Sequence, residues 1–189
     1  DFQATLEIKP EKAIKLEKDA LAQIENITAD NARLVSNLHA NLGGLYRMNG
    51  HPDLAREHME KSISLLDQFN LLHINDSIPQ IANYAMFLTE QQEPERGISE
   101  LQKLSGIIKE YHSDDCLDYA KVQETLGTIY LMTANLPQAK THFKRAFKIY
   151  EKIWADEPEM IEAKYQEIQE LYPQIGFCIG KNLSGLLTK

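Results

Sequence analysis

Histidines, cysteines and carboxylates are the residues of this chain that are able to do chemistry, but their spacing forms no recognisable site. The chain has 6 His, 2 Cys and 28 Asp plus Glu residues. Two histidines one helical turn apart, an HExxH motif or a CxxC pair would indicate zinc, and none of these patterns occurs. Glycine-rich phosphate loops and the GxSxG nucleophile motif are also missing from the sequence. We therefore predict a non-catalytic protein with no cofactor and no metal.

Composition narrows the classes of partner. The chain of 189 residues carries 20 Lys plus Arg against its 28 acids, a formal net charge of -8. This balance disfavours nucleic acid or an anionic membrane as the main partner. The basic run 140–145 is interpreted as a solvated helix face. No apolar run reaches the ~18 residues of a membrane-spanning helix, and the start of the chain lacks the features of a signal peptide.

The cysteines indicate the redox compartment, and the first residue indicates how the chain arose. Cys116 and Cys178 are far apart and lie in no cluster, so both are predicted to be free thiols in a reducing compartment, here the cytoplasm. The chain begins at Asp1 without an initiator Met, which we interpret as an excised domain or a processed chain.

An internal repeat is the strongest pattern in the sequence. Residues 42–46 read Leu-Gly-Gly-Leu-Tyr and residues 126–130 read Leu-Gly-Thr-Ile-Tyr. In both copies an Ala follows the first Gly at twelve residues, and Met59 or Phe143 follows it at sixteen. A degraded copy lies halfway at residues 84–88, where Ala85 stands in place of Gly. A fixed period of 42 residues predicts an array of helix pairs.

This pattern resembles the tetratricopeptide repeat, in the 42-residue version that occurs in kinesin light chain. The resemblance extends from about Pro10 to Tyr172 and implies an all-α, right-handed solenoid of antiparallel helix pairs. Apolar residues at 3.6 spacing and prolines near helix starts support it independently. The expected helices span residues 10–27, 31–49, 52–70, 77–91, 94–111, 115–133, 136–155 and 159–172.

These helices are expected to form one domain over residues 1–189. A half repeat covers about 1–28, and complete repeats cover about 31–72, 73–112 and 114–156. Capping helices are expected over about 159–189, including the apolar segment 175–187. The small residues Gly43, Ala85 and Gly127 are interpreted as places where helices approach closely.

A groove face is expected opposite the apolar stripe of each first helix. Asn41 and Asn83 recur 42 residues apart on this face. In the repeat type that the chain resembles, Asn at this place contacts the backbone of an extended peptide. The alternative is an Asn that bonds neighbouring helices. The complete set of candidate peptide-binding residues, called the groove stripe below, is Asn37, Asn41, Met48, Asn83, Met86, Glu90, Lys121, Glu124, Thr125, Thr128 and Met132.

Three of the five Met residues fall on this stripe, which suits a surface that accepts varied apolar side chains. Ordinary packing between the first helices is the alternative, and it is the favoured explanation of these methionines. The sequence therefore predicts a module that binds a protein or peptide in its groove. Two alternatives stay open. One is a scaffold or homo-oligomer that works through apolar solenoid ends or docks flanking domains there. The other is the peptide-sensing domain of a larger regulator.

Overall fold

The computed structural model describes residues 10–171, and within that range every regular element is an α-helix. The helices are α1 (Pro10–Ala22), α2 (Ala32–Met48), α3 (Pro52–Gln68), α4 (Ser77–Glu90), α5 (Pro94–Tyr111), α6 (Leu117–Met132), α7 (Leu136–Ile153) and α8 (Pro158–Leu171). The helix predictions are confirmed, apart from shifts at the ends. The expected apolar helix over 175–187 lies outside the described residues.

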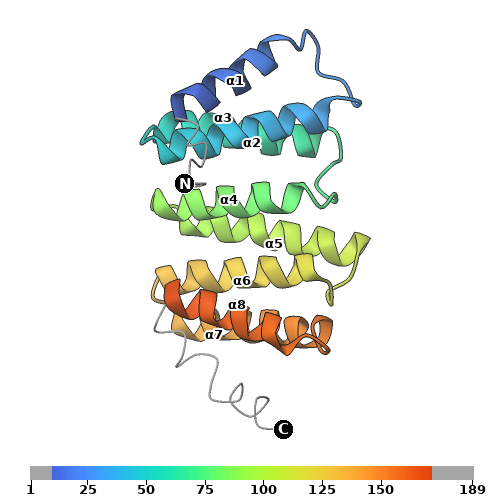
Figure 1. The fold of residues 1–189 in the computed structure, drawn as a ribbon, viewed down its shortest axis with the longest axis vertical. Helices are drawn as coiled ribbons and strands as arrows, with labels where there is room; N and C mark the ends of the chain where they lie inside the picture. Colours follow the sequence, from blue (N-terminus) through green and yellow to red (C-terminus); the bar gives the residue numbers. More distant parts are fainter. Residues whose placement is uncertain (1–9, 172–189) are drawn as a thin grey trace, which may run out of the picture. The chain divides into compact units, whose positions relative to one another are not determined.

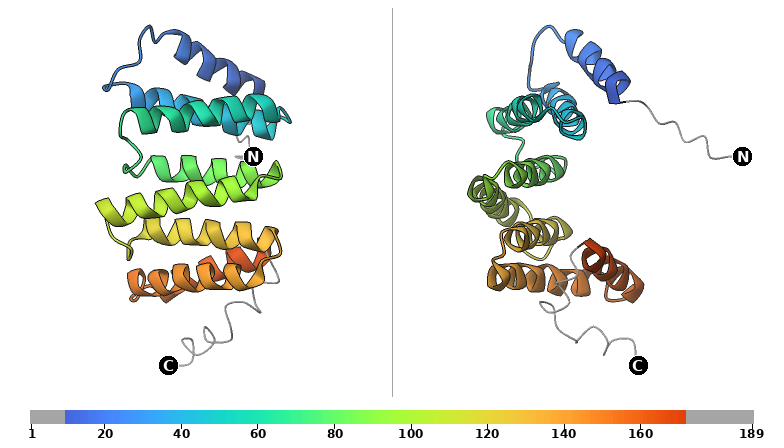
Figure 2. Two further views of the ribbon diagram at one scale, coloured as in Figure 1. Left: turned by 180° about the vertical axis from the view of Figure 1, so that it is seen from behind. Right: turned by 90° about the vertical axis from the view of Figure 1, so that its left-hand side faces the viewer.

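The chain divides into two compact units, and the boundary falls inside α4 between Phe87 and Leu88. The first unit contains α1, α2, α3 and most of α4. The second contains the end of α4 and α5 to α8. Figures 1 and 2 show α2 lying beside α3, and α6 lying beside α7, as antiparallel pairs. The repeat boundaries drawn from the sequence stay a prediction.

The turn inside each helix pair recurs with the sequence period. Gly50, Gln92 and Ala134 lie 42 residues apart and all have positive φ, at 75°, 66° and 57°. The N–H of the residue after each one bonds back to a carbonyl of the last helical turn, for example His51 N to Tyr46 O at 2.9 Å. This left-handed cap ends a helix by satisfying its terminal carbonyls. Three different sequences therefore make the same turn.

Close packing explains the glycine at the second position of each clear copy of the repeat. A Cβ placed on Gly43 would lie 2.5 Å from Met59 Cγ, and a Cβ on Gly127 would lie 2.9 Å from the Phe143 ring. Both separations are below van der Waals contact, so α2 approaches α3, and α6 approaches α7, only because a side chain is missing. Gly43 and Gly127 thus occupy equivalent places, and Ala85 is fully buried.

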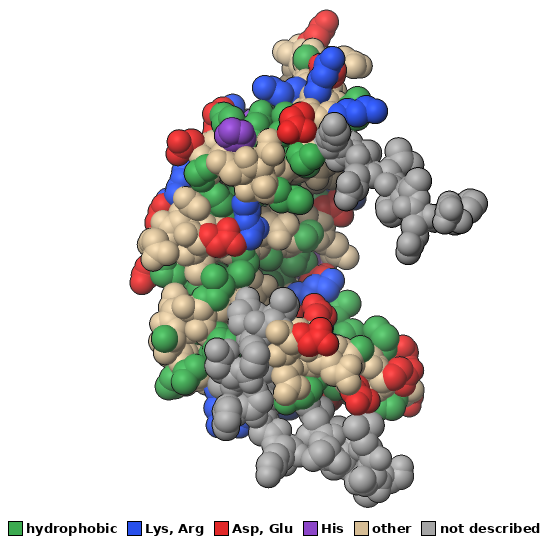
Figure 3. All heavy atoms as spheres, turned by 60° about the vertical axis from the view of Figure 1, so that its left-hand side comes forward, with side chains coloured by type: hydrophobic (Ala, Val, Ile, Leu, Met, Phe, Trp, Pro, Cys, Tyr) green, Lys and Arg blue, Asp and Glu red, His purple; other side chains and the backbone are tan. Residues whose placement is uncertain are grey.

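The first helix departs most from expectation. α1 ends at Ala22, five residues before the predicted end, because Asn31 organises the following loop. The Asn31 side chain accepts from Thr28 N at 2.8 Å and donates to Asn26 O at 2.9 Å. No residue of α1 is fully buried, and Leu16 is 55% exposed. Figure 3 shows charged side chains gathered over α1 at the upper end of the view.

Candidate functional site

The groove stripe of the first unit lines a hollow of about 560 Å³. The candidates Asn37, Asn41, Met48 and Asn83 all contribute to its wall, from α2 and α4. Gly44 leaves this wall open at its middle, because a Cβ added there would have nothing within 4 Å. The 3.6-residue spacing on α2 and α4 therefore brings four of the predicted residues to one surface.

The three asparagines of the hollow differ in what they contact. Asn37 is half-buried, and its Oδ1 accepts from Gln80 Nε2 at 2.6 Å. Asn41 is exposed and donates to Glu17 Oε1 of α1 at 3.0 Å. Asn83 is exposed, and its amide has no partner among the described residues. Asn37 therefore joins two helices, whereas Asn83 presents both a donor and an acceptor to solvent.

A buried polar cluster, which the sequence did not reveal, supports this wall from beneath. Gln80 Oε1 lies 2.8 Å from Ser36 Oγ and 2.5 Å from Ser62 Oγ. Both serines are essentially inaccessible to solvent. Buried hydroxyls need partners, and one amide of α4 serves residues of α2 and α3. In the sequence, this cluster was indicated only by a serine, Ser62, at an otherwise apolar position of its helix.

The methionines of the stripe are unequally exposed. Met48 is 80% exposed and Met132 is 44% exposed, whereas Met86 is half-buried. Met48 lies on the rim of the hollow of the first unit. An 80% exposed Met contributes little to the core, so packing does not explain its presence at this position.

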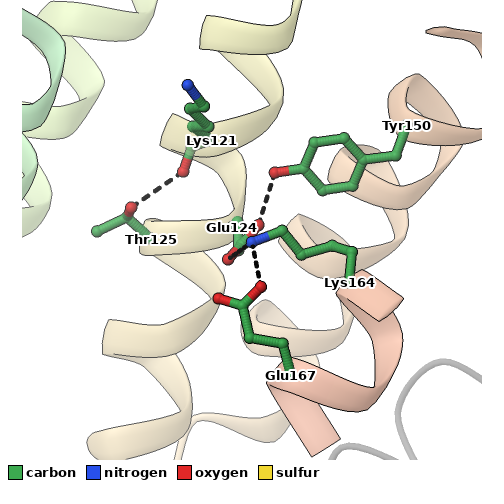
Figure 4. A network of polar contacts seen from close by, with 6 residues as sticks. All are labelled: Lys121, Glu124, Thr125, Tyr150, Lys164 and Glu167. Carbon is green, nitrogen blue, oxygen red and sulfur yellow. Dashed lines mark hydrogen bonds and ion pairs between the residues drawn. The ribbon is translucent and has the colours of Figure 1, made fainter. Parts of the chain in front are cut away.

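In the second unit two of the groove candidates, Glu124 and Thr125, make hydrogen bonds within the fold (Figure 4). Glu124 accepts from Tyr150 Oη at 2.6 Å and from Lys164 Nζ at 3.2 Å. Lys164 also donates to Glu167 at 2.9 Å. Glu124 therefore ties α6 to α7 and α8, a role that was missed because Tyr150 and Lys164 lie far away in the sequence.

Charge and burial in this network shift two pKa values. Burial, followed by the Glu124 carboxylate, raises the pKa of the Tyr150 hydroxyl, which stays protonated and donates. Burial alone would lower the pKa of Lys164, but Glu124 and Glu167 outweigh it and raise that pKa. A neutral donor, Tyr150, and a cation, Lys164, therefore meet at Glu124, and Glu167 is a second carboxylate on that cation. This is a stable structural arrangement.

The remaining candidates of the second unit differ in exposure and in bonding. Thr125 donates its hydroxyl to Lys121 O of the same helix at 2.9 Å, a common local bond of threonine in helices. Lys121 and Glu90 are exposed, and Thr128 is half-buried. Among the described residues, the groove stripe therefore meets a hollow in the first unit and an internal network in the second.

Comparison with known proteins identifies the repeat. Residues 77–152 match the family model described as tetratricopeptide repeat. Residues 77–152 therefore carry tetratricopeptide repeats. The solved structure described as BtubC (BKLC) from P. vanneervenii shares the fold, with a TM-score of 0.71 and 19% sequence identity. The similarity covers 88% of this chain and 66% of that chain, so the present chain spans about two thirds of its neighbour. A search of the curated proteins gave no match. The predicted all-α, tetratricopeptide-type fold is confirmed.

Histidines pack inside the helix pair α2–α3. His39 Nδ1 lies 2.8 Å from His58 Nδ1, and the His58 ring stacks on Tyr46 with centroids 5.4 Å apart. Burial, and then the neighbouring His58, lowers the pKa of His39 to about 4. Burial also lowers the pKa of His58. These are packed, neutral histidines, and residues 10–171 contain no group of three side chains able to hold a metal ion.

Within residues 10–171, no helix combines the length and the apolar character needed to cross a bilayer. The same range offers Cys116 as a free thiol, which accepts from Tyr119 N at the start of α6.

Proposed function

We propose that this chain is a non-catalytic module that binds an extended peptide segment of a protein partner on the hollow of its first unit. Tetratricopeptide repeats generally mediate protein–protein interactions, which supports the class of function. The observation that carries the finer proposal is Asn83, an exposed amide without a described partner in the wall of a hollow of about 560 Å³.

The chemistry of the wall suits a peptide backbone. An Asn amide offers a donor and an acceptor, which match the N–H and C=O of one peptide group. Asn83 is ready for such a pair, and Asn41 has to share or release its bond to Glu17. Met48, on the rim, adapts its shape to different apolar side chains. This arrangement favours binding through the backbone, with side-chain preference coming from the apolar rim.

The groove candidates of the second unit play a smaller part in this proposal. Glu124 is held by Tyr150 and Lys164, so peptide binding there requires breaking internal bonds. Glu90, Lys121, Thr128 and Met132 stay candidates as flanking contacts. We place the peptide mainly along α2 and the first part of α4. The free thiol of Cys116 fits a reducing, cytoplasmic setting for this interaction.

A displayed peptide library tests the proposal. Peptides selected on the wild-type chain are measured by fluorescence anisotropy against Asn83→Ala and against Gln102→Ala, a matched loss of an exposed amide on α5. Loss of one hydrogen bond with its partner left unpaired is worth about 1–2 kcal/mol, so Asn83→Ala is expected to weaken binding roughly tenfold.

The control and the thermal stability separate binding from folding. Gln102→Ala is expected to bind as the wild type does, and both variants to unfold at the wild-type temperature. Equal affinities for Asn83→Ala and wild type would reject the groove. A large loss of stability in Asn83→Ala without a loss of binding would make Asn83 a structural residue.

A second candidate function is a scaffold or homo-oligomer acting through an end of the array. It is favoured by α1, which has no fully buried residue and exposes Leu16. Self-association or docking of a flanking domain would cover this helix. Light scattering over a range of concentrations tests it, because a strict monomer for both wild type and Leu16→Glu would leave only the groove. The peptide-sensing role in a larger regulator would use the same groove.

A further inference from the structure

A hollow of about 620 Å³ in the second unit is lined by five basic side chains. It is lined by residues of α5, of the loop that follows α5, of α6 and of α7. Its cations are Lys109, Lys144, Arg145, Lys148 and Lys152, all exposed to solvent. The run 140–145, taken from the sequence as an ordinary solvated face, therefore forms part of a concave basic surface.

Carboxylates do not neutralise this basic hollow. Asp114 and Asp115 are the acids that line it, and Asp115 is paired with Lys152. Lys144, Arg145 and Lys148 have no ion pair with any described residue. Like charges one turn apart destabilise a helix, so helix stability does not account for the neighbouring cations Lys144 and Lys148. A binding function does account for them.

The floor of the hollow adds apolar area beneath the cations. Tyr119 and Ile149 line it and are nearly buried, at 3% and 5% exposure. Lys109 Nζ lies 5.2 Å from the centroid of the Tyr119 ring, which holds that cation against the wall. A low-dielectric floor strengthens the attraction between these cations and an anionic ligand.

The spacing of the cations matches an extended chain. Lys144, Lys148 and Lys152 follow one another at intervals of about one turn, roughly 6 Å along the helix. Alternate side chains of an extended peptide are about 6.6 Å apart on one face. We propose that the basic hollow binds an acidic peptide segment of a protein partner, with carboxylates at alternate positions facing α7.

Nucleic acid fits this surface less well. The row of cations covers only about 12 Å, and the aromatic ring in the hollow, Tyr119, is too buried to stack on a base. The net charge of -8 also repels a long polyanion more strongly than a short acidic segment. The acidic peptide site is separate from the proposed groove and stands or fails independently of it.

A synthetic probe tests the assignment. A fluorescein-labelled nonapeptide of alternating glycine and glutamate is titrated with the chain at low salt, beside a peptide with glutamine in place of glutamate. We expect the glutamate peptide to bind and the glutamine peptide not to bind. Affinity is expected to fall at least about fivefold between 0.02 and 0.3 M NaCl, because salt screens exposed charges.

Variants locate the site. Lys144→Gln with Lys148→Gln is expected to weaken binding at least about fivefold, because two charge-assisted contacts are lost. The matched control, Lys12→Gln with Lys15→Gln on α1, removes the same charge outside the hollow and is expected to change affinity less than about twofold, through net charge alone. Asn83→Ala should leave binding of this probe unchanged, which keeps the two proposals distinguishable.

Three results would overturn the proposal. One is equal weakening by both double variants, which would show a net-charge effect. Another is tighter binding of an oligonucleotide or of anionic vesicles than of the peptide at equal charge. The third is a fall in the unfolding temperature of the Lys144 and Lys148 variant, because relief of like-charge repulsion should leave that temperature equal or higher.

Discussion

The pair α2–α3 of the first unit and the pair α6–α7 of the second are built to one plan. His58 and His142 lie 84 residues apart and stack on Tyr46 and Tyr130, with ring centroids at 5.4 and 5.2 Å. Their Nδ1 atoms differ in partner. His58 meets His39 Nδ1 at 2.8 Å, and His142 meets Gln123 Oε1 at 2.9 Å. The two pairs therefore share the stack of a histidine on a tyrosine, but they differ in the residue that lies against the histidine Nδ1 atom.

The same two pairs also differ in how the helix contact is filled. Ser36 and Ser62, with Gln80, form a polar cluster in the first unit. The corresponding positions of the second unit hold Ala120 and Ala146, both fully buried. Small size is the shared requirement, while polarity is optional as long as each buried hydroxyl has a partner. At these two positions the repeats therefore keep the small side-chain volume but not the polarity.

The largest expected effect concerns the close approach that both pairs share. Gly127→Leu should destabilise the fold by about 1–3 kcal/mol, because the added side chain meets the Phe143 ring. Gly43→Leu should behave in the same way against Met59. Urea unfolding measures both. Gly44→Leu is the control, because a Cβ there meets nothing within 4 Å, and an equal loss in that control would refute the packing argument.

The polar cluster of the first unit gives the next largest effect. Gln80→Ala is expected to cost about 1–2 kcal/mol, because it leaves buried serine hydroxyls with fewer partners. The same change in a Ser36→Ala, Ser62→Ala background, which copies the alanines of the second unit, should cost less. A double-mutant cycle measures this coupling. Identical costs in the two backgrounds would show that the cluster contributes nothing.

The histidine pair predicts where acid sensitivity resides. The pKa of His39 is lowered from 6.5 to about 4, so between those values the unfolded chain binds a proton that the folded chain does not. The contribution of His39 to the free energy of unfolding is fully present above about pH 6.5, declines as the pH falls, and is lost below about pH 4. His39→Gln copies the Gln123 arrangement and should reduce this decline, measured by urea unfolding at pH 5 and pH 7.

A reference variant sharpens that test. Burial lowers the pKa of His142 as well, so some acid sensitivity should remain after His39→Gln. Gln123→His, the reverse exchange, should increase the decline. An unchanged pH dependence in both variants would mean that the pair does not control acid stability.

The smallest effect concerns the repeated turn. Gln92 and Ala134 adopt the positive φ that Gly50 adopts without strain. Ala134→Gly should therefore stabilise the chain by about 0.5–1 kcal/mol, and Gly50→Ala should destabilise it by a similar amount. Thermal unfolding measures both changes. Stabilisation by Gly50→Ala would contradict the shared turn geometry.

Much of the fold could be predicted from the sequence because the residues that determine it act locally. Helix limits followed from apolar spacing and from prolines such as Pro52 and Pro94 in first-turn positions. The repeat period located Gly43 and Gly127 at the helix contact. The end of α1 was wrong because one side chain, Asn31, organises the loop before α2 through bonds that no periodicity encodes.

The polar contacts were decided only by the tertiary structure. Asn41 and Asn83 were placed on one face by spacing alone, but whether a stripe residue faces an open hollow or a neighbour depends on distant side chains. Tyr150 and Lys164 reach Glu124 from two other helices. Lys109 of α5 lines the same hollow as the cations of α7, although it lies more than 30 residues before them in the sequence. Hydrophobic periodicity repeats every few residues along the chain, whereas a hydrogen bond or charge cluster needs two elements to meet at about 3 Å. That meeting is set by packing.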